Sequence, residues 1–532
     1  MRALFVVLAT VAVLGAPAVV GAQVGTTTDI LTGVVADSSG RVLEGAIVEA
    51  TSVQTELTRK AQTNDKGRWT IVFPDGGGQY TLVIRYVGMA PARMTLARQA
   101  DEDRLVANVR LSTIAQQLQA VVVRGQNRRP RGNDRAGAGS RETDIPSDRA
   151  ARLPVDASDL MALATLAPGV VGIDATDSTD AAFSVAGLRP TENSVTLDGL
   201  SFGSGSVPQD AVRTTRVVTS TYDVARGGFS GGLVASTTQG GTNTPQGSFT
   251  YTLRDRSLAW GVADSLFPQA FSQNQLGGGF GGPIVRNKLF VFGALQGRWR
   301  TNQMSTLLDA RGPVLTRIGV SPDSVSRFLS LVNGAGISPT APVLSPDQAA
   351  DNYVGLLRLD YLVSDRNTLM LRGDWRRITQ DPTRVSSSAL PQTGGSSATS
   401  GGGIMAVLTS YIGDRYINEL RAYYSQDRRS ASPVLDLPEG RVQVASDLSG
   451  DTRAVSTLSF GGNPSLPQST HNSSFETTDE LSWLQGAAHR VKLGVYFNAT
   501  RYLQDVTSNQ NGVFTYPSLD AQVVGMLDGS LA

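Results

Sequence analysis

The sequence predicts a mainly β protein with three parts: an N-terminal β-sandwich, a small α+β domain, and the N-terminal part of a transmembrane antiparallel β-barrel. The 57 glycines and the aromatic share of only 6% are typical of strands and turns rather than of helices. Beyond the N-terminal segment, no apolar run is long enough for a membrane-spanning helix, so a crossing would require a closed barrel. After Pro245, apolar and polar residues alternate over long segments, which is the period of a strand.

Residues 1–22 have the three-part pattern of a secretory signal peptide. Arg2 is followed by an apolar run up to Val20, and Gly21 and Ala22 complete a cleavage site of small residues. A membrane anchor is the alternative. Because the run contains Gly15 and a proline and lacks a basic flank, the pattern favours secretion.

The composition excludes several classes of function. The 532 residues include no cysteine, which excludes disulfides, thiolate metal sites and cysteine nucleophiles. With 47 basic and 46 acidic residues, the charge balance does not favour a nucleic-acid partner. His471 and His489 are the only histidines, no Gly-x-Ser-x-Gly elbow precedes a predicted helix, and no phosphate loop occurs. We therefore expect no enzyme: no catalytic residue, no cofactor and no metal site.

Residues 23–113 are predicted to form the β-sandwich. Short alternating runs are separated by turn signals rich in Gly, Asp and Asn. The runs are residues 31–35, 46–50, 69–73, 80–86 and 105–111. Residues 32–37, residues 45–48, the turn at 63–67 and Gly88 resemble the carboxypeptidase regulatory-like domain, a module with a carbohydrate-binding-like fold. This segment contains no histidine, so it offers no ligands for a peptidase zinc. The module could contact carbohydrate or protein, but a simple apolar core is the favoured interpretation.

Residues 114–140 combine a short β-prone segment with a flexible linker rich in Arg, Gly and Asn. The segment comprises Leu118, Gln119, Ala120, Val121, Val122, Val123 and Arg124. A β-prone segment beside a flexible tether is suited to strand addition at a partner's sheet edge. The last strand of the sandwich, or a merely solvated basic linker, are the alternatives.

Residues 141–246 are predicted to form the α+β domain. A helix is expected over residues 157–166, with Asp156 and Asp159 near its N-terminus and Pro168 at its end. A strand that ends in Asp198-Gly199 and a glycine-rich run over residues 222–232 describe a small sheet packed close to surrounding walls, because glycine allows close backbone approach.

The α+β domain resembles the plug domain of TonB-dependent outer-membrane receptors. The residues that carry the resemblance are Gly187, Arg189, Asn193, Leu197, Asp198, Gly199, Tyr222, Gly227, Gly228, Gly231 and Gly232. The resemblance implies a cell outer membrane location in a Gram-negative-type bacterium, with the sandwich and plug on the periplasmic side. It also implies that TonB, with its inner-membrane energising complex, contacts the segment from Leu118 to Arg124.

Residues 247–532 are predicted to form part of an outer-membrane β-barrel. In residues 357–363 and 369–376, one face is apolar and suits lipid, whereas the other carries Arg358, Asp360, Arg372 and Asp374. The pattern returns at residues 419–424 and 491–500. Short links at residues 364–368 and 485–489 alternate with long ones at 377–404 and 426–475, as in outer-membrane barrels.

Residues 281–292, 417–421 and 489–494 resemble barrel strands of Oar-like TonB receptors. We count about ten candidate strands after Pro245, whereas such receptors close with about twenty-two. A half barrel would leave open edges in lipid, and the sequence has no terminal aromatic residue, so we expect a C-terminally truncated chain.

The function implied by the resemblance is uptake of an external ligand through a plugged barrel, energised by TonB. The ligand could be a chelated metal, an oligosaccharide or a peptide, and outer-membrane lipid is the other expected partner. The alternative is a passive outer-membrane barrel or surface adhesin whose N-terminal sandwich binds carbohydrate or protein.

Overall fold

The computed structural model describes most of the chain beyond residue 27. The described residues are 28–73, 78–98, 104–112, 141–150, 152, 158–173, 182–203, 206–220, 231–258, 271–304, 306–340, 347–413, 416–448, 452–485 and 489–519. Strands dominate, so the predicted fold class is confirmed. Among these residues, no helix is both long and apolar enough to span a lipid bilayer.

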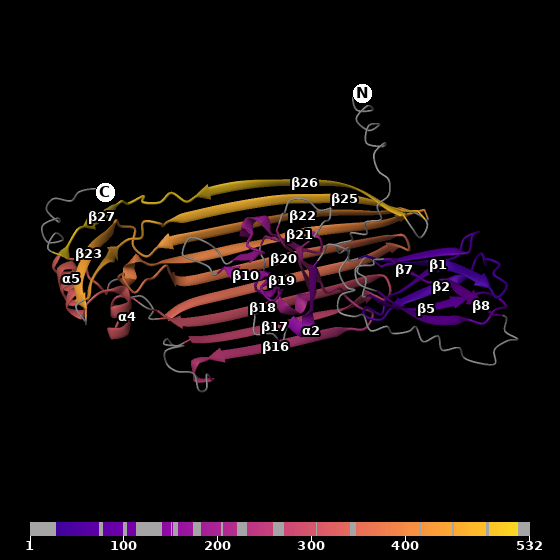
Figure 1. Cartoon of the computed structure of the whole chain (residues 1–532), viewed down its shortest axis with the longest axis horizontal. Coiled ribbons are helices and arrows are strands. Elements are labelled where there is room, and N and C mark those ends of the chain that lie inside the picture. The colour runs from indigo at the N-terminus through magenta and orange to yellow at the C-terminus, as the bar shows by residue number, and fades with distance from the viewer. Residues whose placement is uncertain are drawn as a thin grey trace, which may run out of the picture.

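The N-terminal domain is a sandwich of two four-stranded sheets, as predicted (Figure 1). One sheet contains β1 (Asp29–Asp37), β4 (Arg68–Phe73), β7 (Arg104–Val106) and β8 (Val109–Leu111). The other contains β3 (Thr58–Gln62), β2 (Ile47–Ser52), β5 (Gln79–Arg85) and β6 (Ala92–Ala97), in that order. The edge strands β3 and β6 were not predicted. Strand β3 is almost entirely polar, whereas β6 alternates Ala92, Met94 and Leu96 with Arg93 and Thr95, a signal that was available in the sequence. The predicted strand at 105–111 is split in two where Asn108 accepts a hydrogen bond from the Val34 amide (3.1 Å).

A second unit, which we call the inner domain, follows the linker. Its five-stranded sheet has the order β13-β12-β15-β14-β9, and a ribbon of two strands lies beside it. The elements are β9 (Arg141–Pro146), α2 (Ser147–Ala150), α3 (Leu160–Ala164), β10 (Val170–Ile173), β11 (Ala182–Val185), η2 (Pro190–Glu192), β12 (Ser194–Leu197), β13 (Leu200–Ser201), η3 (Gln209–Ala211), β14 (Val212–Ser220) and β15 (Leu233–Thr238). Helix α3 is shorter than the predicted 157–166, because Asp159 is its N-cap and accepts hydrogen bonds from the Met161 and Ala162 amides.

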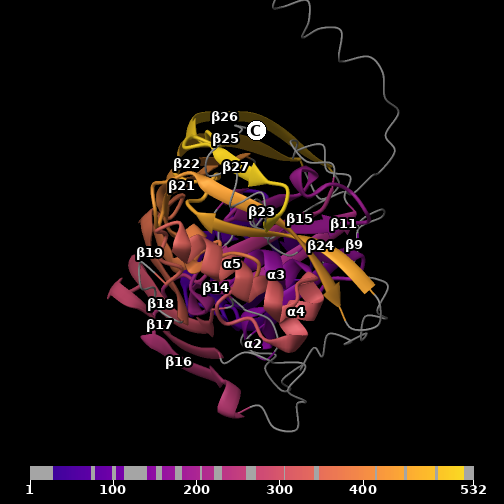
Figure 2. The ribbon, with the colours of Figure 1, turned by 90° about the vertical axis from the view of Figure 1, so that its left-hand side faces the viewer.

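Nine antiparallel strands form the large sheet. In order they are β16 (Gln246–Asp255), β17 (Phe271–Val285), β18 (Leu289–Gln303), β19 (Asp347–Ser364), β20 (Asn367–Thr383), β21 (Gly395–Ile412), β22 (Tyr416–Pro433), β25 (Gln468–Gln485) and β26 (His489–Asp505). Viewed along the strands, the sheet is an arc that curves around the inner domain (Figure 2). Strands β16 and β26 are the edges of the arc.

The strands of the large sheet are longer than predicted, and the long connections are correspondingly shorter. Strand β20 runs to Thr383 and β21 begins at Gly395, within the stretch expected to be a loop. Glycines such as Gly403 obscured this strand in the sequence. A Cβ there would lie 2.6 Å from the Tyr423 hydroxyl, so the glycine makes room for a neighbouring strand's side chain.

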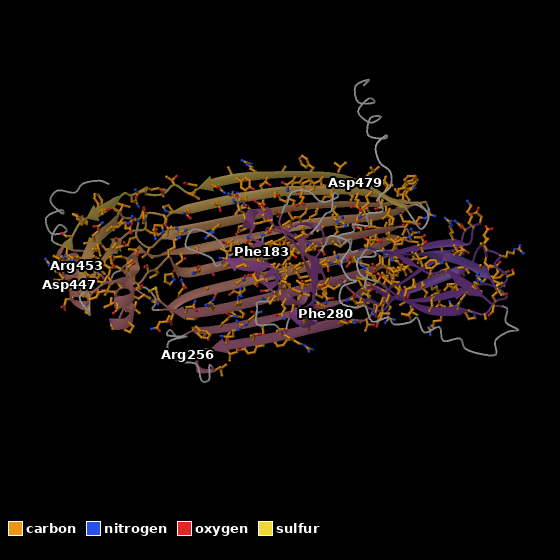
Figure 3. All side chains as sticks on the ribbon, viewed as in Figure 1. Phe183, Arg256, Phe280, Asp447, Arg453 and Asp479 are labelled. Atoms are coloured by element: carbon orange, nitrogen blue, oxygen red, sulfur yellow. The ribbon has the colours of Figure 1, made fainter. Side chains whose placement is uncertain are left out.

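A small subdomain lies beyond the end of the sheet opposite the sandwich (Figures 1 and 3). Because it lies outside the large sheet, we call it the external subdomain. It contains α4 (Gly312–Ile318), α5 (Pro322–Gly334), β23 (Glu439–Leu448), β24 (Thr452–Gly461) and β27 (Val513–Tyr516). The sequence suggested about ten barrel strands after Pro245. The described residues contain nine in the large sheet and three in this separate one. Two short 3-10 helices, η4 (Arg256–Leu258) and η5 (Pro391–Thr393), lie in connections.

The two faces of the large sheet differ as the alternation predicted. Leu357 is 53% exposed on the outer face, whereas its neighbour Arg358 is 1% exposed on the inner face. Leu420 and Tyr424 are exposed on β22, and Arg421 and Tyr423 between them are buried. The convex face is therefore apolar, and the concave face carries charge against the inner domain.

Candidate functional site

The contact between the inner domain and the concave face of the large sheet is the candidate site. Apolar residues of both units form one continuous core: Leu197, Phe202 and Val207 of the inner domain join Phe292, Leu356, Met370, Met405 and Tyr423 of the sheet. Phe183 of β11, labelled in Figure 3, belongs to the same core. The inner domain is thus packed directly against the concave side of the large sheet, which we call the wall.

A tight turn of the inner domain reaches the wall. Strands β12 and β13 are joined through Asp198 and Gly199, with Leu197 paired to Leu200. Both turn residues have positive φ angles, 53° and 91°, which is the geometry of a two-residue hairpin turn and explains the Asp-Gly sequence. A Cβ on Gly199 would lie 3.3 Å from the Arg421 Nε atom, so the glycine also permits close approach to the barrel.

The Asp198 carboxylate is buried, and both of its oxygens have hydrogen-bond or ion-pair partners. It accepts hydrogen bonds from the Thr238 amide (2.8 Å) and hydroxyl (2.9 Å). It forms an ion pair with Arg372 at 2.5 Å, and one of its oxygens lies 3.9 Å from Arg358. The turn is therefore fixed to the inner domain's own sheet and to two strands of the wall.

Arg358 and Arg372 are directly opposite each other in the register of β19 and β20. Each is only 1% exposed. Like charges directly opposite on neighbouring strands repel each other. Here Asp198 lies within ion-pairing distance of both guanidinium groups and compensates the repulsion.

Each arginine also has a carboxylate two residues further along its own strand. Arg358 binds Asp360 at 2.8 Å, and Arg372 lies 3.5 Å from Asp374. Arg358 also donates to the Thr238 hydroxyl (2.8 Å). The Arg372 guanidinium lies 5.9 Å from the ring centre of Phe202 and 5.3 Å from that of Tyr423, a cation–π arrangement.

The charges of this ion cluster balance. The positive members are Arg213, Arg358, Arg372 and Arg421, and the negative members are Asp198, Asp360, Asp374 and Glu419. Arg213 lies on β14 of the inner domain, where burial lowers its pKa, while Asp360 and Asp198 favour its charged form. Buried ions are tolerated only when they are paired, so removal of one member leaves an uncompensated charge.

Further hydrogen bonds join the inner domain to the wall away from the ion cluster. The Ser201 amide donates to Glu476 of β25 (3.0 Å), and the Gln209 amide donates to Gln296 of β18 (2.9 Å). Asp210 accepts from Ser248 of β16 (2.5 Å). The wall contacts therefore extend over the whole arc.

The predicted plug residues are distributed over two places. Leu197, Asp198 and Gly199 lie in the contact with the wall. Asn193 lies inside the inner domain, where it donates to the Phe183 carbonyl (2.7 Å) and accepts from the Gly232 amide (2.8 Å). The adjacent Gly231 leaves room for this contact, because a Cβ there would overlap the Asn193 side chain.

The remaining predicted residues do not join the site. Gly187 and Arg189 lie in an exposed turn before η2. Outside the described residues lie the predicted signal peptide, the predicted TonB-contact segment from Leu118 to Arg124, and Tyr222, Gly227 and Gly228.

Arg213 and Thr238 are members of the site that the sequence did not suggest. Arg358 and Arg372 were predicted to face inward, but not to pair with Asp198. The repeated Arg-x-Asp pattern on both sides of the turn at residues 364–367 was an available signal, because a hairpin places two such patterns opposite each other.

Comparisons with known proteins agree with this architecture. The profile of the outer membrane beta barrel domain matches residues 237–316 and 314–525. The profile of the carboxypeptidase regulatory-like domain matches residues 30–112. No protein of curated function matches the chain.

Several solved structures resemble it. The outer membrane transporter YddB from Escherichia coli is 14% identical over 74% of this chain and 51% of its own, with a TM-score of 0.50. The ferric enterobactin receptor PfeA from Pseudomonas aeruginosa (14%, covering 70% and 51%) has a TM-score of 0.45. The siderophore receptor PirA from Acinetobacter baumannii (15%, covering 69% and 49%) has a TM-score of 0.43. The chain spans about half the length of these proteins, and at this identity the likeness to the first shows the fold alone.

Proposed function

Because the chain belongs to the outer membrane beta barrel domain family, whose profile covers more than half of it, we propose that it is a receptor and active transporter of the outer membrane. The inner domain acts as a plug: it closes the path, and an external ligand crosses when the plug rearranges. In this proposal residues 23–113 are the periplasmic sandwich, 114–140 the TonB-contact segment and linker, 141–246 the plug, and 247–532 the barrel part.

The buried ion cluster between plug and wall is the observation that carries the proposal. Asp198 pairs with Arg372 and Arg358 where all three side chains are nearly inaccessible to water. Separation of such a pair exposes an uncompensated charge, so the plug does not leave its place spontaneously. Work supplied from outside the chain, by TonB acting on the segment from Leu118 to Arg124, would provide the energy.

The external ligand would meet the end of the barrel that carries the external subdomain. Chelated metals, oligosaccharides and peptides are the classes to test.

A cysteine cross-linking experiment tests the TonB contact without knowledge of the ligand. The chain has no native cysteine, so Val121→Cys gives a single reactive position. In outer membranes mixed with a TonB periplasmic domain that carries one cysteine in its edge strand, we expect a cross-link through strand addition. Ala136→Cys in the same linker is the matched control. Equal cross-linking at both positions, or none at Val121→Cys, would contradict the TonB contact.

Uptake experiments test transport itself. Cells would be given a radiolabelled ferric siderophore, a fluorescent maltooligosaccharide or a fluorescent oligopeptide. We expect deletion of residues 119–124 to reduce accumulation of the transported probe to the level of a strain without TonB, whereas deletion of residues 133–138 leaves it unchanged. Undiminished uptake after the first deletion would instead indicate a passive barrel.

A further inference from the structure

The N-terminal sandwich is docked on one end of the barrel. In Figure 1 it lies at the end where the short turns join β17 to β18 and β19 to β20, opposite the external subdomain. The loop after β2 and the start of β3 face this rim. The sandwich therefore presents a defined edge to the mouth of the barrel.

Arg59 of β3 is the polar anchor of the contact. Its guanidinium donates to the Thr368 hydroxyl of β20 (3.0 Å) and lies 5.5 Å from the ring centre of Phe73. Its Nε atom is buried and has no hydrogen-bond partner among the described residues. Burial lowers the pKa of Arg59 to about 10, and the negative charge of Asp365 opposes this shift, so the group remains a cation at neutral pH. Asp365, in the β19–β20 turn, lines the same cavity of about 510 Å³ as Arg59 and is the rim carboxylate that faces it.

Asn243 joins three parts of the molecule at the same rim. It lies in the connection between the inner domain and β16. Its side chain donates to the Glu56 carbonyl of the sandwich (3.0 Å) and to Asn287 in the β17–β18 turn (2.7 Å). Thr244 also donates to the Glu56 carboxylate. The contact is therefore made of matched donors and acceptors and does not rest on a single residue.

An apolar patch completes the interface. Ile30 and Val72 of the sandwich are buried against Ile417 and Tyr411 of the barrel. Ile30 is 1% exposed and Ile417 is 5% exposed. Burial of isoleucines at a contact between two domains favours their association.

The docked sandwich and the ion cluster line one shared cavity at the rim. A cavity of about 70 Å³ is lined by Arg59 and Phe73 of the sandwich, Asp198 and Arg213 of the inner domain, and Thr409 of the barrel. The space can hold only one or a few water molecules. The sandwich thus forms one side of the space next to the Asp198 turn. The larger cavity of about 510 Å³, lined by Arg59, Thr368 and Thr409, lies between the sandwich and the barrel.

We propose that the sandwich is a second seal of the barrel, which caps the mouth beneath the plug, and that Arg59 with the facing Asp365 is one of the contacts that hold it there. The sandwich must leave the rim before a ligand passes from the lumen. This inference rests on the proposed function only in taking that end as periplasmic. Its tests use neither TonB nor uptake, so either proposal can fail while the other stands.

The first test is whether the sandwich is docked in the membrane. In outer membranes that contain the full chain, Arg59→Cys with Thr368→Cys should be joined by a short bismaleimide, because these side chains are in contact. Lys66→Cys with Thr368→Cys is the control, since the turn after β3 lies at the opposite end of the sandwich. Equal cross-linking of the two pairs, or none of the first, would overturn the proposal.

The second test is whether docking seals the cavity. Thr409→Cys, 5% exposed, is placed in the otherwise cysteine-free chain and its reaction with a polyethylene glycol maleimide is timed. We expect Arg59→Glu to accelerate labelling about tenfold, because the glutamate faces Asp365 and weakens docking. Arg59→Glu with Asp365→Arg should restore slow labelling, and Lys66→Glu should have no effect.

The restoration by the charge swap separates undocking from misfolding. Fast labelling in the chain with native Arg59 would show that the sandwich does not seal the mouth. Fast labelling that persists in the charge swap would show that Arg59 and Asp365 do not hold it. Either result overturns the proposal.

Discussion

At the scale of single residues, Asp198 illustrates how a turn of the inner domain meets the wall. Arg358 and Arg372 are opposite each other on adjacent strands, an unfavourable pair unless an anion lies between them. Asp198 contributes that anion, although it lies 174 positions before Arg372 in the sequence. Its own orientation is fixed by the two hydrogen bonds from Thr238.

The first prediction concerns this carboxylate. Asp198→Ala should lower the free energy for releasing the inner domain from the wall by about 3–5 kcal/mol, because it leaves two buried guanidinium groups uncompensated. The measurement is the urea concentration at which the inner domain becomes sensitive to protease in outer membranes. The exposed Asp447→Ala serves as the control.

A second substitution tests the cause of the loss. If charge imbalance is responsible, Arg358→Met added to Asp198→Ala should recover part of the loss, a coupling that a double-mutant cycle measures. Unchanged urea resistance in Asp198→Ala would contradict the role of the ion cluster.

The second prediction concerns the adjacent glycine. Gly199 has a φ of 91°, and a Cβ there would lie 3.3 Å from Arg421. We expect Gly199→Ala to destabilise the docked inner domain by about 1–2 kcal/mol, the cost of a left-handed alanine. Gly203→Ala, where a Cβ would meet no atom within 4 Å, is the matched control in the same urea and protease assay. Equal effects of the two substitutions would show that the turn geometry is not limiting.

At the scale of elements, the β19–β20 hairpin shows why the alternation was informative. Each strand places successive side chains on opposite faces, so one apolar and one charged face follow from the sequence alone. The hairpin has these faces as predicted: Leu357 and Leu371 are exposed, and Arg358 and Arg372 are buried. The edge strand β26 is largely exposed on both faces, because it has a neighbouring strand on one side only. Its Tyr496 shares a hydrogen bond with Ser201 of the inner domain.

The third prediction tests whether the convex face lies in lipid. Leu357 on β19 and Leu437 in an external connection are both 53% exposed, so they differ in their surroundings and not in their burial. We expect Leu357→Arg to impair membrane insertion, with a cost of about 2–4 kcal/mol at the bilayer midplane, whereas Leu437→Arg should be neutral. The measurement is the amount of chain in the outer membrane fraction. Loss of both variants, or of neither, would contradict a lipid-facing β19.

At the scale of the whole molecule, the described parts stack in one direction: sandwich, inner domain within the arc of nine strands, and external subdomain (Figures 1 and 2). The ion cluster lies between inner domain and wall, and the Arg59 contact lies between sandwich and rim. In the proposed mechanism, a path along the barrel meets these two contacts in series.

The fourth prediction tests the proposed rearrangement of the inner domain. Ser201→Cys with Glu476→Cys, joined by a bis-methanethiosulfonate reagent, ties the inner domain to β25, whose contact there is 3.0 Å. We expect uptake of the transported probe to stop and to return after reduction. Ser425→Cys with Ser474→Cys ties two paired barrel strands and should leave uptake unchanged. Uptake that continues through the first cross-link would show that this contact does not open.

The fold class was predictable because its signals are local. These signals were the alternation of strands and the turns marked by glycine and asparagine. The same signals identified the sandwich and the strands that carry Arg358, Arg372 and Arg421. The edge strand β3 was missed because it is almost entirely polar, whereas β6 was missed although its apolar alternation is regular. The external subdomain was missed because α5 and β23 bury a shared core, around Phe328 and Val442, that no local period reveals.

The site itself was predictable only in part. The Asp-Gly turn marked Asp198 and Gly199 as residues of a close contact, and alternation marked Arg358 and Arg372 as inward-facing. The sequence by itself thus determined which face of the wall is charged and which is apolar, since the period of a strand depends only on neighbouring residues. Only the tertiary structure decided that Asp198 lies between the two arginines and that the sandwich covers the barrel mouth. Both depend on packing between segments far apart in the chain, and the energy of a buried charge is set by the partner that packing brings to it.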